Sequence, residues 1–242
     1  MQLARPRITI GGVLAYAIIC ALCWWSVRWI GSANRFNRLG TRALHPINHY
    51  DDRVQSEVAA IWSRIEIALA RHDRKYVEEL GPPATDEELA TLEETLGYRI
   101  PGELRASLKV HAGSAEFLSI FELYDVREID SDWSAYVDTT TSVVTEPLTA
   151  TPEAFESYAW HPGWIPIAGW DVFRILVNVE TGEVCHWDKS NAKPQARSWK
   201  RWLEVVADRL ESGEYHPFAP GDSMWEGTDD YWTPGSERKQ SE

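Results

Sequence analysis

The most regular alternation of hydrophobic and polar positions lies in residues 164–187. An apolar run, 164–168, is followed by a stretch, 172–179, that is rich in the β-branched and aromatic side chains typical of strands. Every second residue of that stretch is large and apolar, and these residues are Phe173, Ile175, Val177 and Val179. Such a period of two places them on one face of a strand. With a turn at 180–183, the pattern predicts an antiparallel meander at the centre of the fold.

Helical periodicity flanks this meander on both sides. Apolar residues that recur three and four positions apart predict helices over residues 51–80, 85–96, 101–110 and 198–212. Thr85 and Glu88 fit a capping box at the start of the second of these helices. Residues 119–129 have the pattern of a strand and its exit, and 130–151 and 190–197 that of polar loops. Together these elements predict an α+β fold in which helices flank an antiparallel-rich central sheet.

An uncharged stretch precedes all of these elements. Residues 8–27, from Ile8 to Val27, contain no charged side chain and are long enough to cross the core of a bilayer as a helix. Trp24 and Trp25 lie near its end, where aromatic side chains are common at a membrane interface. We predict an uncleaved transmembrane anchor, and the alternative is a long signal peptide that is removed on export. The flanking arginines favour a single-pass protein with a cytoplasmic domain.

Changes in composition divide the chain into four parts. Residues 1–33 form the predicted membrane anchor, and 34–80 a basic linker followed by the long amphipathic helix. Residues 81–213 form the predicted folded domain. Residues 214–242 are rich in Gly, Pro, Asp, Glu and Ser, which predicts an acidic and disordered tail. The amphipathic helix would either connect the anchor to the domain or pack on the domain.

The charge of the chain is unevenly distributed. The formal net charge is -13, yet residues 1–50 contain six arginines and no acidic residue, which leaves 18 basic residues against 37 acidic ones in the remainder. So acidic a domain repels phosphate backbones, which excludes nucleic acid as an expected partner. It suits a basic protein partner, although solubility alone would also explain it. The candidate contact residues on the helix at 85–96 are Glu87, Glu88, Glu93 and Glu94, which we interpret as a solvated acidic face.

A second candidate contact lies at the entry of the central strand. Thirteen tryptophans occur in the chain, and most should be buried because their side chains cover a large apolar area. Trp170 and Asp171 lie between the apolar run and the following strand, where side chains at a loop are more accessible. We therefore select this pair as an exposed contact for a protein partner, since aromatic side chains anchor many interfaces.

The sequence contains little that indicates catalysis. His186 and Asp188 are two residues apart, so on a strand they share a face and could form half of a metal site or a His–Asp pair. A third group would still be needed, and we find no G-x-S-x-G motif, phosphate-binding loop or dinucleotide fingerprint. Three cysteines do not form a disulfide framework. We predict neither enzymatic activity nor a metal ion nor a cofactor, and a hydrolase that uses His186 and Asp188 is the less favoured alternative.

The order of these motifs resembles the SUKH superfamily, which includes fungal Smi/Knr-type cell-wall regulators and bacterial immunity proteins. The resemblance covers roughly residues 80–210. It rests on the acidic helix start at 85–89, Leu-Gly-x-x-φ-Pro at 96–101, His-Ala-Gly at 111–113, Trp-φ-Pro-φ-Ala at 164–168, Gly-Glu-Val at 182–184 and Ser-Trp at 198–199. It implies a SUKH-like α+β domain that acts through contact with another protein.

The resemblance also indicates a function. It implies a membrane-anchored binding module similar to an immunity protein, which neutralises a cognate toxin, here a basic toxin domain, by direct contact. The acidic face would accelerate association with such a partner. The alternative is a membrane-tethered regulator of cell-wall or envelope assembly. Neither hypothesis requires a small-molecule substrate.

Overall fold

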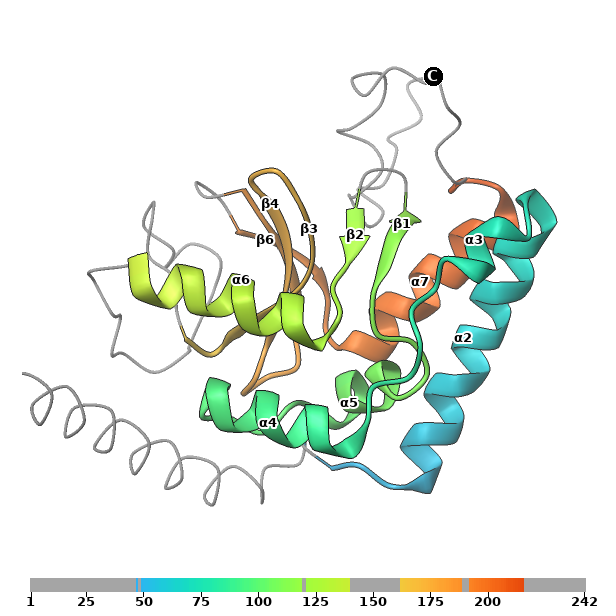
Figure 1. The fold of residues 1–242 in the computed structure, drawn as a ribbon. Helices are drawn as coiled ribbons and strands as arrows, with labels where there is room; N and C mark the ends of the chain where they lie inside the picture. Colours follow the sequence, from blue (N-terminus) through green and yellow to red (C-terminus); the bar gives the residue numbers. More distant parts are fainter. Residues whose placement is uncertain (1–46, 48, 119–120, 140–161, 189–191, 216–242) are drawn as a thin grey trace, which may run out of the picture.

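The computed structural model describes residues 47, 49–118, 121–139, 162–188 and 192–215 (Figure 1). The predicted membrane anchor, the basic linker and the acidic tail from residue 216 onward lie outside these residues. Within the described ranges, no helix has the length and hydropathy needed to cross a membrane. The prediction for residues 8–27 therefore stays a prediction.

A six-stranded antiparallel sheet forms the centre of the fold, and its strands follow one another in chain order. The strands are β1 (Ser114–Leu118), β2 (Phe121–Leu123), β3 (Trp164–Trp170), β4 (Phe173–Asn178), β5 (Val184–Trp187) and β6 (Ala192–Ala196). The predicted antiparallel α+β architecture is confirmed. The sequence pattern assigns residues 190–197 to a loop, but they contain β6. The prediction misses this strand because two consecutive residues, Lys193 and Pro194, are exposed and interrupt the alternation of apolar and polar positions.

Helices cover both faces of this sheet (Figure 1). They are α2 (Asp52–His72), α3 (Lys75–Glu78), α4 (Asp86–Leu96), α5 (Gly102–Leu108), α6 (Val126–Thr139) and α7 (Trp199–Ser212). Helix α6 lies against one face and contacts β3, while α5 and α7 lie at the other face and contact each other. Helix α2 packs against both α5 and α7. The sheet is therefore enclosed between two helical layers.

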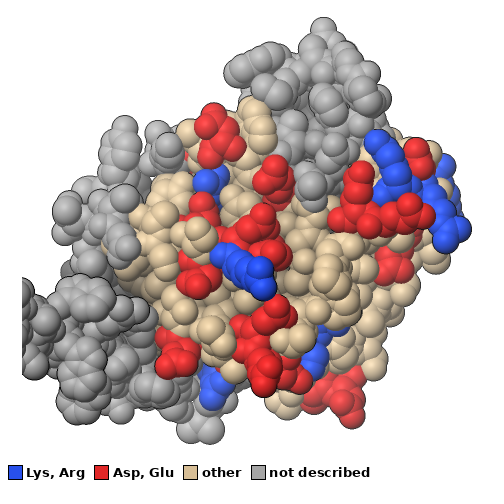
Figure 2. All heavy atoms as spheres, in the orientation of Figure 1, with Lys and Arg blue, Asp and Glu red and all other residues tan. Residues whose placement is uncertain are grey.

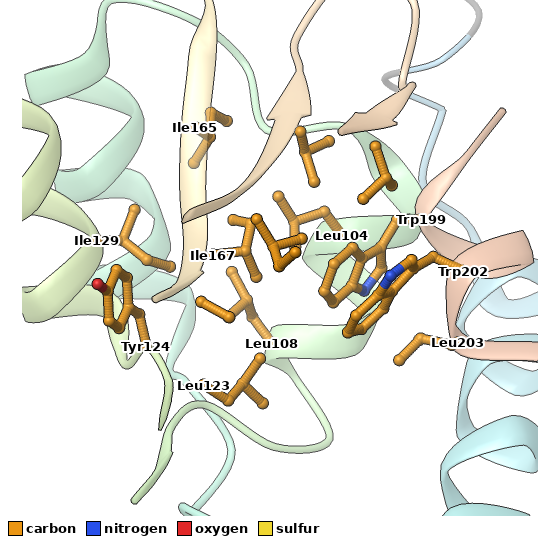
Figure 3. Packing of buried hydrophobic residues seen from close by; sticks show 14 of the residues in the cluster. Leu104, Leu108, Leu123, Tyr124, Ile129, Ile165, Ile167, Trp199, Trp202 and Leu203 are labelled. Atoms are coloured by element: carbon orange, nitrogen blue, oxygen red, sulfur yellow. The ribbon is translucent and has the colours of Figure 1, made fainter. Parts of the chain in front are cut away.

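The hydrophobic core lies between the sheet and these helices (Figure 3). Ile167 of β3 lies close to Leu104 and Leu108 of α5, and the indoles of Trp199 and Trp202 stack with 4.7 Å between their ring centroids. All five of these side chains are almost entirely removed from water. Burial of several large apolar side chains from three elements is the main favourable contribution to folding.

The long amphipathic helix packs on the domain, which is one of the two alternatives that its sequence allows. Trp62 of α2 is fully buried and donates from Nε1 to the Ser107 hydroxyl on α5 at 2.9 Å. The helix ends at His72, however, and not near residue 80. The backbone becomes extended at Asp73, and the short helix α3 follows. The periodicity alone does not reveal this break because apolar residues recur on both sides of it.

Helix α4 begins as its sequence predicts. The Thr85 hydroxyl accepts a hydrogen bond from the Glu88 backbone N–H at 3.1 Å, and the Glu88 carboxylate accepts one from the Thr85 backbone N–H at 2.9 Å. These two bonds satisfy backbone donors that have no partner within the helix. The helix ends at Leu96, and the capping residue Gly97 has a φ of 70°, in the left-handed region that glycine adopts without strain.

Helix α6 is the main element that the sequence pattern misses. Residues 119–129 and 130–151 are predicted as a strand exit and a polar loop, whereas β2 ends at Leu123 and α6 begins at Val126. The Asp125 carboxylate accepts from the backbone N–H groups of Arg127 and Glu128 at 2.7 and 2.8 Å and starts the helix. Because α6 covers the second face of the sheet, β4 is buried on both faces rather than one.

Candidate partner-binding surface

Trp170 and Asp171 lie at the tip of the hairpin formed by β3 and β4. Trp170 is the last residue of β3, and Asp171 and Val172 form the loop before Phe173 opens β4. Asp171 is exposed, and its φ of 48° makes it the one described residue other than glycine with a positive φ. Side chains other than glycine adopt this region at a cost in free energy, although aspartate tolerates it better than most. We call residues 170–172 the hairpin tip.

A row of half-buried rings begins at the hairpin tip and crosses three strands. The Trp170 ring stacks on Phe173 with 6.1 Å between centroids and 3° between planes, and Phe173 stacks on His186 of β5 at 5.4 Å and 14°. All three side chains keep part of their surface in contact with water. We call Trp170, Phe173 and His186 the aromatic strip. Such partly exposed rings offer apolar area at little cost in side-chain entropy, which is a property of interface anchors.

On the opposite face of β4, Arg174 connects the hairpin tip to α6. Its guanidinium donates to both carboxylate oxygens of Asp132, from Nε at 2.8 Å and from Nη2 at 3.1 Å. Nη1 donates to the backbone carbonyls of Asp171 and Phe173, each at 2.7 Å. Burial acts to lower the pKa of Arg174, but hydrogen bonding and charge from Asp132 raise it above its usual value. A charged arginine in a strand of mostly apolar residues is the available signal for this contact, but its partner cannot be identified without the fold.

The acidic residues of α4 do not form one solvated face. Glu87, Glu88 and Glu94 are exposed, whereas Glu93 is only 3% exposed, so its interpretation as a solvated contact residue is wrong. The Glu93 carboxylate accepts from the Ile100 backbone N–H at 3.0 Å and from the guanidinium groups of Arg99 and Arg105. Its position follows from the helical register, because Glu93 lies on the side of α4 that faces α5.

Other acidic side chains supply the charge of this face. Figure 2 shows acidic groups over the side of the molecule on which α4 and α6 lie. Glu128 of α6 is exposed like Glu87 and Glu94 of α4. The basic residue Arg127 of α6 is also exposed, and its charge acts on Glu88. Glu88 has a lowered pKa because the backbone and side chain of Thr85 donate hydrogen bonds to its carboxylate. Its first role is therefore to cap α4.

The region around His186 and Asp188 does not resemble a metal centre. Within the described ranges, no group of three or more His, Cys, Asp and Glu side chains could hold a metal ion. Burial lowers the pKa of the His186 imidazole, although the charge of Asp188 opposes this shift. The imidazole lies in the aromatic strip, where it stacks on Phe173. The arrangement favours a role for His186 in packing.

Comparisons with known proteins agree with the fold and the motifs. The model of the SMI1/KNR4 family (SUKH-1) matches residues 83–205. A glucan synthesis regulatory protein of Neurospora crassa is 23% identical over 210 residues, which cover 65% of this chain and 39% of the relative. The cell wall biosynthesis/cell cycle regulator smi1 of Schizosaccharomyces pombe is 26% identical over 186 residues, with 65% and 37% covered.

A KNR4/SMI1 homolog of Yarrowia lipolytica is 22% identical over 254 residues, which cover 78% of this chain and 36% of the relative. The chain thus spans less than half the length of these fungal proteins. The family model nevertheless extends from the start of the α4 region into α7 and includes every strand of the sheet. This chain belongs to the SMI1/KNR4 family (SUKH-1).

Proposed function

We propose that this chain is a protein-binding regulatory domain that acts in the control of cell-wall or envelope synthesis. The observation that carries the proposal is the match of residues 83–205 to a family whose relatives are named as regulators of glucan synthesis and cell-wall biosynthesis. A regulatory role accords with contact between proteins as the mode of action. The match favours this hypothesis over neutralisation of a toxin, because none of the three relatives is named as an immunity protein.

The contact surface that we propose is the hairpin tip with the aromatic strip. Trp170 and Phe173 supply partly exposed apolar area, and Asp171 supplies an exposed carboxylate beside them. Apolar anchors surrounded by charged groups are typical of the centre and rim of an interface. The excess of acidic residues over the domain favours a partner with a basic surface, whose approach it would accelerate.

A membrane tether is part of the proposal. Residues 8–27 are long and apolar enough to cross a bilayer, and the flanking arginines favour a domain on the cytoplasmic side. In that arrangement the domain would act close to enzymes that assemble the wall at the membrane. The support for the tether is the sequence alone.

The test is complementation of a gene deletion in the native host. Incorporation of a labelled cell-wall precursor is measured in the deletion strain and in strains that express the wild-type chain or a tip variant, Trp170→Ala with Asp171→Ala. The matched control is Ile67→Ala, which removes an exposed large hydrophobic side chain from α2, away from the tip. Protein levels and melting temperatures are compared for all three chains.

We expect deletion to change precursor incorporation, and the wild-type chain and the Ile67→Ala control to restore it. The folded tip variant should fail to restore it. Unchanged incorporation in the deletion strain would contradict the regulatory function. Full complementation by the tip variant would contradict the proposed contact surface.

A further inference from the structure

The conformation of the hairpin tip is stabilised by contacts outside the loop. A loop of two residues joins β3 to β4, and its first residue, Asp171, has a positive φ. Residues other than glycine persist in this region when surrounding contacts fix them there. The exposed side chain of Asp171 cannot provide such contacts through packing. A hairpin loop of two residues itself places its first residue at a positive φ, and further contacts to this loop come from its backbone.

Arg174 supplies these contacts. One guanidinium nitrogen, Nη1, donates to the carbonyl oxygens of Asp171 and Phe173, so the two ends of the turn converge on a single group. Hydrogen bonds from a charged donor are stronger than those between neutral groups. The two bonds fix the orientation of the Asp171–Val172 and Phe173–Arg174 peptide groups.

The remaining part of the guanidinium is held by α6. Nε and Nη2 form a two-pronged contact with Asp132, and the side chains of both residues are largely buried, with 12% and 20% of their surface exposed. The ring centroids of Tyr124 and Tyr136 lie 6.0 and 5.7 Å from the guanidinium carbon of Arg174. A planar fork is specific to arginine, since a lysine ammonium could not reach Asp132 and both carbonyls in this geometry.

We propose that Arg174 is the positioning residue of the hairpin tip, which it holds in its binding conformation and couples to α6 through Asp132. The link between this conformation and partner binding rests on the function proposed above. The positioning itself does not, because it concerns only the backbone of residues 171–174. A displacement of α6 would therefore change the presentation of Trp170 and Asp171.

The chain permits a selective test of this inference. Labelling of aspartate at the carbonyl carbon with ¹³C and of valine at nitrogen with ¹⁵N selects amides in Asp-Val pairs, and the sequence contains two such pairs, at 125–126 and 171–172. The full chain in detergent micelles should give one signal for Val126 at the start of α6 and one for Val172 in the hairpin tip. Val172→Ile assigns the two signals.

Three variants are compared with the wild-type chain. Arg174→Lys keeps a positive charge but cannot form the fork, and Asp132→Asn removes the charge of the partner on α6. The matched control is Arg209→Lys, because Arg209 is also largely buried, donates to the Tyr215 hydroxyl and lies over the Tyr215 ring, but belongs to α7. The Val172 signal is sensitive to hydrogen bonding at the adjacent Asp171 carbonyl.

We expect Arg174→Lys and Asp132→Asn to move the Val172 signal, and Arg209→Lys to leave it in place. An unchanged Val172 signal in a folded Arg174→Lys chain would overturn the positioning role. If Arg174→Lys does not fold, Asp132→Asn provides the test. A shift of the Val172 signal supports the coupling to α6, and a shift of the Val126 signal alone overturns it. None of these readings requires a partner.

The complementation assay then separates the two proposals. If the Val172 signal moves and Arg174→Lys also fails to restore precursor incorporation, positioning and binding are linked. If the signal moves but the variant complements fully, Arg174 positions the tip but this positioning is not required for function, so only the link between positioning and binding is overturned.

Discussion

At the scale of single residues, Glu93 shows how a charged side chain becomes part of the interior. It lies on the buried side of α4 and accepts hydrogen bonds from the Ile100 backbone and from two arginines, Arg99 and Arg105. A buried carboxylate is tolerated only when its oxygens are satisfied in this way. The Glu93 carboxylate therefore connects α4 to the segment that leads into α5.

Replacement of this carboxylate should destabilise the fold. Glu93→Gln removes the charge that balances two arginines and replaces one carboxylate oxygen, an acceptor, by an NH2 group, a donor. We expect the free energy of unfolding to fall by about 2–3 kcal/mol. The matched control is Glu94→Gln on the exposed side of the same helix, where we expect a change within about 0.5 kcal/mol. Urea unfolding measures both. Equal effects of the two substitutions would contradict the account of Glu93.

Gly169 gives a second prediction at this scale. A Cβ atom at this position would lie 2.0 Å from the Tyr124 hydroxyl oxygen and 2.9 Å from Cδ of Arg174. We expect Gly169→Ala to lower the free energy of unfolding by about 1–3 kcal/mol because the site has no space for a methyl group. Addition of Tyr124→Phe, which removes the hydroxyl, should recover part of that loss. Purely additive effects of the two substitutions in thermal unfolding would show that the hydroxyl is not the obstacle.

At the scale of elements, ion pairs connect α2 to α7. Arg64 of α2 donates to Glu211 and Asp208 of α7, and Lys200 of α7 donates to Glu57 of α2 at 2.7 Å. The pKa values of Glu211 and Glu57 are lowered by hydrogen bonding to Arg64 and Lys200, respectively. These side chains are partly exposed, so solvent screens each pair and the hydrophobic contacts between the helices contribute more.

These pairs predict a pH dependence with a definite sign. Because the pKa of Glu211 is lower in the folded chain than the ordinary value of 4.5, its stabilisation is present above that value and is lost as the pH falls through the folded-state pKa. Glu211→Gln should therefore be slightly less stable than the wild-type chain at neutral pH, and the difference should disappear at strongly acidic pH. Arg64→Gln should behave in the same way. A difference that is constant with pH in urea unfolding would contradict this role.

The same scale shows what sequence patterns can predict. The capping box of Thr85 and Glu88 and the strand alternation from Phe173 to Val179 are local, so the sequence reveals the start of α4 and the central meander. The sequence pattern does not predict helix α6 because its apolar residues are separated by polar ones. They become buried only when the helix packs on the sheet. For the candidate site, the sequence identifies Trp170 and Asp171, but the stacking of Phe173 on His186 and the bond from Arg174 to Asp132 depend on strand register and helix placement.

At the scale of the whole molecule, the core extends beyond the region that matches the family. The match begins at residue 83, yet α2 ends before it and contributes Val58, Trp62, Ile65 and Leu69 to the interior. The imidazole of His111 strengthens this connection, since Nε2 lies 2.7 Å from the Glu66 carboxylate and the ring packs edge-on against Trp62. Helix α2 is therefore an integral part of the described structure.

Truncation tests this conclusion. Removal of residues 1–46, which precede the described core, should leave a cooperative thermal transition because none of the described core contacts is lost. Removal of residues 1–80 also removes α2 and exposes the apolar surfaces of α5 and α7, so we expect the cooperative transition to disappear. Circular dichroism at rising temperature measures both. A cooperative transition in the chain that lacks residues 1–80 would show that α2 is not required for folding.

We propose that the hairpin tip contacts a protein of the cell-wall synthesis machinery. It is tested most directly by a photo-crosslinking amino acid placed at Trp170, and at Ile67 as a control, in the full chain expressed in the native host. We expect a discrete crosslinked product from position 170 that contains a wall-synthesis protein, and no such product from position 67. The absence of a crosslinked protein at position 170, or the same products from both positions, would contradict it.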